Sequence, residues 1–132
     1  MNKFIVAVIA SSLIFISCKK ENCPAPETPY MAGLWQGKYG GTTSYPTSGY
    51  SALFRSNGTV RFFDGADTTS ASKAEGTYTV AGSTVTATYT YLPSGPQYSI
   101  SATVDSKFTF LEGTYGAGAS TSGSGKWFMV KK

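Results

Sequence analysis

Five carboxylates are the side chains with which the folded part of this chain could do acid–base or metal chemistry: Asp64, Asp67, Glu75, Asp105 and Glu112. The sequence contains no histidine, which is the commonest general base and metal ligand. Two of the five carboxylates, Glu75 and Glu112, occupy identical Glu-Gly-Thr-Tyr stretches. They could form an acid–base pair only if their two strands met. Asp64 and Asp67 share a loop without further oxygen ligands, which favours a solvated turn over a calcium site. We therefore predict a protein that is not an enzyme, with no catalytic residue, metal or cofactor.

Cys18 carries the clearest covalent chemistry of the chain. It follows a basic residue and an apolar run of about 13 residues, which is typical of a secretory signal and shorter than a membrane-spanning helix. The residues from Leu13 to Cys18 (LIFISC) resemble a bacterial lipobox, whose cysteine receives diacylglycerol before cleavage. This resemblance implies a signal peptide at residues 1–17 and an acylated Cys18 held in a lipid bilayer. An ordinary signal peptide or an uncleaved anchor helix is the alternative.

The residues that follow Cys18 indicate a cellular location and a linker. Lys19-Lys20-Glu21 resembles the charged export tag of surface-displayed lipoproteins of Bacteroidota, which implies an outer-membrane location with either surface or inward display. Residues 18–32 contain three prolines and no alternating pattern, so we expect a linker that reaches about 45 Å at most. Cys23 is then either a free thiol or an intermolecular link. Residues 33–132 remain as one domain.

Strand periodicity dominates this domain. Residues 84–91 alternate threonine with apolar or aromatic residues, which is the pattern of a strand with one buried face. Turn signals such as Asn57-Gly58, expected to form a type I′ turn, divide the rest into similar lengths. We predict strands at 34–40, 49–55, 59–64, 75–80, 84–92, 97–104, 107–115 and 124–131.

Eight short strands joined by tight turns predict an all-β fold, an eight-stranded up-and-down antiparallel barrel, because closure removes exposed strand edges. A β-sandwich is the alternative. Two loops, 64–73 and 116–125, are longer and should be mobile; in this topology they open at one end, the candidate mouth. Near Glu112 we expect a bulge, because strict alternation from Phe110 would otherwise turn Tyr115 outward.

Gly33-Leu34-Trp35 at the start of the first strand and Trp127 in the last strand carry a family resemblance. With eight strands in about 100 residues, they resemble the calycins, and specifically the lipocalin-like domains of bacterial lipoproteins. Lipocalins place an arginine of the last strand over the first tryptophan, and this chain offers only lysines there. The resemblance implies a barrel whose interior binds a ligand.

The inward phase of the predicted strands supplies the candidate ligand-binding residues. They are Trp35, Tyr39, Phe54, Phe62, Tyr78, Tyr89, Tyr91, Tyr98, Phe108, Phe110 and Trp127. Aromatic rings with polar tips suit a small hydrophobic or amphipathic ligand, but an eight-stranded barrel can also be filled solid. The alternative function is therefore a structural or interaction protein, an inhibitor or accessory subunit, that presents its loops to a protein partner. The net charge of +4 is spread along the chain, so we expect no nucleic-acid partner.

Overall fold

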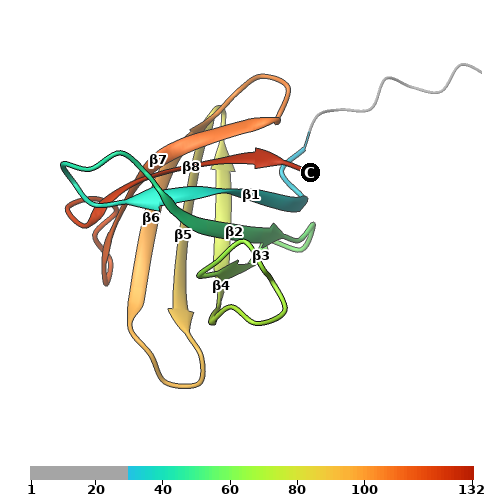
Figure 1. The fold of residues 1–132 in the computed structure, drawn as a ribbon. Helices are drawn as coiled ribbons and strands as arrows, with labels where there is room; N and C mark the ends of the chain where they lie inside the picture. The colour runs from blue at the N-terminus through green and yellow to red at the C-terminus, as the bar shows by residue number, and fades with distance from the viewer. Residues whose placement is uncertain (1–29) are drawn as a thin grey trace, which may run out of the picture.

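The computed structural model describes residues 30–132, so the signal segment 1–17, Cys18 and residues 19–29 of the expected tether lie outside the described residues. The described chain is all-β (Figure 1). Its strands are β1 (Gly33–Gly40), β2 (Ser48–Phe54), β3 (Thr59–Phe63), β4 (Lys73–Ala81), β5 (Thr84–Tyr91), β6 (Gln97–Val104), β7 (Phe110–Ala117) and β8 (Gly125–Lys131). Within residues 30–132 no helix has the length and apolar composition needed to cross a membrane.

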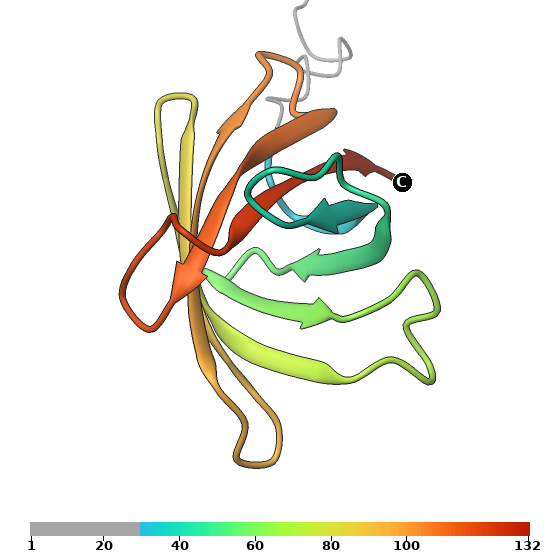
Figure 2. The ribbon, with the colours of Figure 1, turned by 60° about the vertical axis from the view of Figure 1, so that its left-hand side comes forward.

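The sheet closes into an up-and-down barrel, as the periodicity predicts. Each strand pairs antiparallel with the next one, and β8 returns to pair with β1 (Figure 2). Because β1 is bonded on both sides, the two-sheet sandwich is excluded. The closed eight-stranded antiparallel barrel is compatible with the lipocalin-like fold that the sequence resembles.

The alternating pattern determines which residues fill the interior. In β5 the side chains of Val85, Ala87 and Tyr89 are buried, while the threonines between them face outward. Across the outer face, Thr79 of β4 and Thr86 of β5 share a hydrogen bond of 2.8 Å. The threonines of the sequence pattern therefore coat the barrel outside and leave its inside to apolar and aromatic residues.

One predicted turn type is wrong. Asn57 does not have a positive φ, and Gly58 alone does, at φ +82°. The amide of Gly58 donates to the carbonyl of Arg55 at 3.2 Å, and the side chain of Asn57 accepts from the amide of Thr59. This is a one-glycine turn followed by the next strand, which needs a left-handed residue at Gly58 only.

The start of β7 also differs from the expected 107–115. Phe108 lies in a turn with φ 54°, and its amide donates to the carbonyl of Asp105. The strand begins at Phe110 and pairs without interruption with β6 and β8, so the predicted bulge near Glu112 is absent. Moving the start of the strand resolves the conflict of phase, because Leu111 and Tyr115 then face inward.

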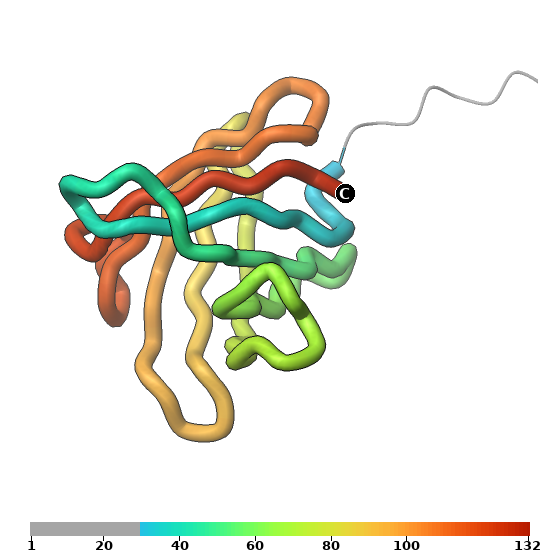
Figure 3. Tube along the Cα trace, in the orientation of Figure 1, coloured from blue at the N-terminus to red at the C-terminus, as the bar shows by residue number. Residues whose placement is uncertain are grey.

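The two ends of the barrel differ in how they are closed. At the end where β1 begins, Met31 is buried in the core and its carbonyl accepts a hydrogen bond of 2.9 Å from the indole of Trp35. The Nζ atom of Lys131 lies 5.9 Å from the centre of the Trp35 ring and donates to the carbonyl of Tyr30 at 2.7 Å. Lys131 thus occupies the position that the resemblance gives to an arginine. The described chain enters the barrel beside its C-terminus at this closed end (Figure 3).

Candidate functional site

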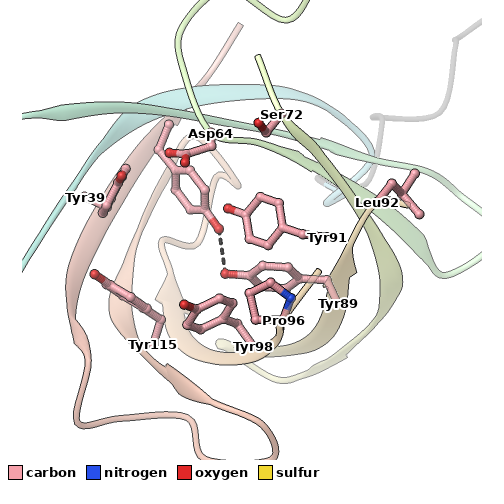
Figure 4. A pocket seen from close by; sticks show the side chains of 10 residues that line it. Tyr39, Asp64, Ser72, Tyr89, Tyr91, Leu92, Pro96, Tyr98 and Tyr115 are labelled. Carbon is pink, nitrogen blue, oxygen red and sulfur yellow. Dashed lines mark hydrogen bonds between the residues drawn. The ribbon is translucent and has the colours of Figure 1, made fainter. Parts of the chain in front are cut away.

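The opposite end of the barrel is open and holds a cavity of about 400 Å³, which we call the tyrosine cup (Figure 4). It is lined by Tyr39, Tyr50, Asp64, Ser72, Tyr89, Tyr91, Leu92, Pro96, Tyr98 and Tyr115. Six of these ten residues are tyrosines, and they come from β1, β2, β5, β6 and β7. The cup therefore depends on the closed barrel rather than on one loop.

Strand register places the tyrosines around one space. Tyr89 of β5 and Tyr98 of β6 are direct cross-strand partners, and Tyr89 has Gly76 as its partner on the other side. A Cβ atom at Gly76 would lie 1.9 Å from the carbonyl oxygen of Thr88, so only glycine allows the two backbones to approach this closely. Because Gly76 has no side chain, the ring of Tyr89 on the neighbouring strand has room to point into the barrel.

The floor of the cup is a packed aromatic layer. The ring of Phe62 lies 4.1 Å from that of Tyr89 and 5.5 Å from that of Tyr50, measured between centroids. Below it, Phe54 packs edge-on against Trp35 at 6.3 Å and against Tyr78 at 4.9 Å. Since Trp35, Phe54 and Phe62 are fully buried, the barrel is solid in this half and hollow above it. From the sequence, either a filled barrel or a hollow one was possible. In the structure, the half around Trp35 and Phe54 is filled and the half at the tyrosine cup is hollow.

Hydrogen bonds hold the tyrosines in place. The hydroxyl groups of Tyr50 and Tyr89 lie 2.7 Å apart and share one hydrogen bond inside the barrel. The Tyr115 hydroxyl donates to the carbonyl of Gly40 at 3.2 Å, which joins β7 to the end of β1. Figure 4 shows Tyr91 and Tyr98 pointing into the same space as Tyr89, with Asp64 at the rim.

Burial sets the protonation of these phenols. It raises the pKa of Tyr89 from 10.0 to about 12, and it also raises the pKa values of Tyr50 and Tyr91 above that of a free phenol. The pKa of Tyr39 is also raised, first by burial and then by a hydrogen bond and the negative charge of Asp64. All four are therefore neutral phenols at physiological pH. The cup offers hydroxyl groups and ring faces, with Asp64 as its charged residue.

Of the eleven aromatic residues predicted to bind a ligand, Tyr39, Tyr89, Tyr91 and Tyr98 line the cup. The other inward-facing residues belong to the solid half or its boundary; they are Trp35, Phe54, Phe62, Tyr78 and Trp127. Sequence reasoning missed Tyr50, although it alternates with Ala52 and Phe54 on the inner face and could have been found there. It missed Tyr115 because the phase of β7 was set from Phe110.

Phe110 was expected inside and lies outside, so that prediction is wrong. Its side chain is 39% exposed and stacks on Phe128 of β8 at 6.3 Å between ring centroids. Phe108, also expected inside, packs against the core only from the turn at the closed end. Both misplacements have one cause, since the turn after Asp105 takes up residues 106–109 and the strand then starts in the opposite phase.

The loop at 116–125 does not cover the cup. The hydroxyl of Ser99 donates to the carbonyl of Gly118 at 2.7 Å, and that of Thr114 donates to the carbonyl of Thr121 at 2.7 Å. Ser99 and Thr114 face outward, so the loop folds back over the outer surface, and Tyr115 before it is the nearest residue to line the cavity. The other long loop does reach the mouth, through Asp64 and Ser72.

The carboxylates do not form a catalytic pair. Glu75 faces outward between Arg55, at 3.1 Å, and Arg61, whose Nε also contacts it. Glu112 is exposed on β7, and β5 and β6 lie between it and Glu75 on β4. Asp67 accepts hydrogen bonds from the amide of Thr69 and the hydroxyl of Ser70 in its own loop. Among residues 30–132 no three His, Cys, Asp or Glu side chains are grouped so that they could hold a metal ion.

Comparison of the chain with protein-family models, with curated proteins and with solved structures finds no match. The closed barrel and the tyrosine cup are therefore the observations on which function has to be argued.

Proposed function

We propose that this protein is a lipid-anchored, non-enzymatic binding barrel that holds a small amphipathic molecule in the tyrosine cup. The observation that carries the proposal is the cavity of about 400 Å³ above a solid aromatic floor. Sites for small molecules are concave, largely apolar and furnished with a few polar groups, and their volumes run from roughly 300 to 1,000 Å³. The cup is concave and has a volume in this range, and its tyrosines supply apolar rings together with polar hydroxyl groups.

The chemistry of the lining supports an amphipathic rather than a purely apolar ligand. Each tyrosine presents a flat apolar ring together with a hydroxyl group that can donate or accept a hydrogen bond. The hydroxyls of Tyr50 and Tyr89 are already paired, while Tyr91 and Tyr98 have rings at 90° to each other, 6.0 Å apart. A ligand with a flat or short apolar body and one polar group would use both features.

The place where the described chain begins bears on anchoring. Tyr30 is fixed by Lys131 at the closed end of the barrel, and the cup opens at the other end. If Cys18 is acylated in the outer membrane, a short tether joins the bilayer to the closed end. The cup then lies at the end of the barrel opposite to the tether, which suits exchange of ligand with the surrounding medium. Display on the cell surface is part of this proposal, drawn from the charged residues after Cys18.

Native and denaturing mass spectrometry of the full chain, purified from its own host, tests both halves of the proposal. We expect a small molecule that leaves on unfolding and is recovered by organic extraction, and an N-terminal diacylglyceryl cysteine at Cys18. Tyr91→Ala should abolish binding of the small molecule. Tyr45→Ala, at a tyrosine that is 78% exposed outside the barrel, should leave binding unchanged. A bare protein mass and no uptake of added ligands would contradict the binding function and favour a protein-interaction role.

A further inference from the structure

The charge of the tyrosine cup differs from that of the whole chain. The sequence carries a net charge of +4, yet the residues that line the cup include one carboxylate, Asp64, and no lysine or arginine. Lys73 follows Ser72 directly in sequence, but its ammonium group donates to the carbonyls of Thr69 and Ala71 within the loop. The cup is therefore a negative site in a basic protein.

The aromatic rings add to this negative character. Three pairs of neighbouring rings meet at steep angles, 63° for Tyr39 with Tyr50, 85° for Tyr39 with Tyr115 and 90° for Tyr91 with Tyr98, whereas Tyr89 and Tyr98 are stacked at 29°. In an edge-to-face pair the ring that presents its edge keeps its faces clear of that partner, and an aromatic face carries the negative end of the ring quadrupole. Phenol oxygens with raised pKa values stay uncharged and can accept hydrogen bonds from a cation.

We infer that the tyrosine cup selects organic cations, so that the amphipathic ligand carries an ammonium group. The inference rests on the proposed binding function and specifies its ligand class. Ring faces attract the cation, and phenol oxygens accept hydrogen bonds from its N–H groups. The carboxylate of Asp64 at the rim supplies the opposite charge. The apolar part of the ligand lies on the Phe62 floor.

An anionic ligand would meet the opposite conditions. It would approach Asp64 with no lysine or arginine among the lining residues to offset the repulsion, and it would face the negative side of the rings. A neutral ligand would gain only the rings and hydroxyls. We therefore expect affinity to fall from cation to neutral molecule to anion when the body of the ligand is kept constant.

Three probes with one shared body test this order. They are 2-naphthylmethylamine, which is a cation at pH 7, 2-naphthalenemethanol and 2-naphthoate, each titrated into the purified full chain by calorimetry. We expect the amine to bind about tenfold more tightly than the alcohol. The carboxylate should bind more weakly than the alcohol.

Asp64→Asn separates charge from shape. It should weaken binding of the amine about three- to fivefold and leave binding of the alcohol unchanged, because an exposed ionic contact is screened by water. Asp67→Asn is the matched control, since Asp67 lies in the same loop, bonds only within it and does not line the cup. It should leave the affinities of all three probes as they are.

The outcomes distinguish this inference from the binding function beneath it. If the alcohol or the carboxylate binds as tightly as the amine, or if Asp64→Asn leaves the preference intact, the inference is wrong while the cup remains a binding site. If none of the probes binds and extraction of the native protein yields no small molecule, the inference and the binding function both fail.

Discussion

Aromatic residues line both ends of this barrel, but they fill one end and surround a cavity at the other. At the closed end, Trp35 and Phe54 are fully buried and pack edge-on against each other, and the carbonyl of the buried Met31 accepts a hydrogen bond from the Trp35 indole. At the open end, the tyrosines surround a cavity of about 400 Å³. The difference lies in the polar tip of the rings, because a tyrosine near water can stand apart from its neighbours while a buried phenylalanine or tryptophan cannot.

Two identical tetrapeptides show the same difference within one sequence motif. Glu75–Tyr78 in β4 and Glu112–Tyr115 in β7 both read Glu-Gly-Thr-Tyr, but the two strands run in opposite directions along the barrel. Tyr78 thus packs at the closed end and donates to the carbonyl of Arg55, whereas Tyr115 lines the cup. Position in the barrel, rather than local sequence, decides whether a tyrosine is part of the core or of the site.

Removing one ring from each half gives the largest contrast. Phe62→Ala should lower the free energy of unfolding by about 3–5 kcal/mol, because it leaves a void in a layer that is fully packed. Tyr91→Ala should cost only about 1 kcal/mol, since its ring is half-buried and already borders the cavity. Urea unfolding of both variants measures the difference. Equal losses would show that the tyrosine ring supports the fold as much as the floor does.

The glycines of the two tetrapeptides should, by contrast, behave alike. A Cβ atom would lie 1.9 Å from the carbonyl oxygen of Thr88 at Gly76 and 2.0 Å from that of Ser101 at Gly113. Each glycine-to-alanine change should therefore cost about 2–3 kcal/mol of unfolding free energy. Gly41→Ala, with nothing within 4 Å, is the control and should change little. A tolerated Gly113→Ala would mean that the backbone of β6 around Ser101 and Ala102 can move away from β7.

Most of the fold could be predicted from the sequence because strand periodicity is local. The threonine alternation of β5 and the turn glycine Gly58 show their effect within a few residues, and closure follows from the need to pair eight short strands. The errors in strand phase arose where residues with a strand-like pattern form a turn instead. Phe108 and Phe110 alternate as a strand should, but the turn after Asp105 reverses their phase.

The site was harder to predict because it depends on distances across the barrel. Nothing local distinguishes Tyr89, which lines the cup, from Phe62 one layer below, since both occupy inward positions of regular strands. Asp64 was assigned to a solvated loop, and its place at the rim follows only from where β3 ends. A rule that aromatic inward positions near the mouth-side strand ends form the site would have found Tyr50 as well.

Alkaline pH should loosen the open end first. Tyr89 has a pKa of about 12 in the folded state against 10.0 for a free phenol, so its neutral form is favoured on folding. This stability is complete below pH 10 and is lost as pH rises toward 12, by about 2 kcal/mol. Urea midpoints between pH 8 and about pH 12 should fall for the native chain and fall less for Tyr89→Phe. Parallel decline in both would assign the loss to groups other than Tyr89.

The smallest effect distinguishes the two glutamates of the repeated tetrapeptide. Arg55 and Arg61 hold Glu75, and although burial opposes them, their hydrogen bonds lower its pKa. Glu75→Gln should therefore cost about 0.5–1 kcal/mol at pH 7, while Glu112→Gln should cost almost nothing.

The sign of the pH dependence provides the check on this pair. A lowered folded-state pKa stabilises the protein above the unfolded value of the carboxyl group and loses that effect as pH falls through the folded value. Urea midpoints of Glu75→Gln and the native chain should consequently converge in acid, and high salt should narrow their gap at pH 7. If Glu112→Gln were equally costly, the two copies of the tetrapeptide would share more than their glycine.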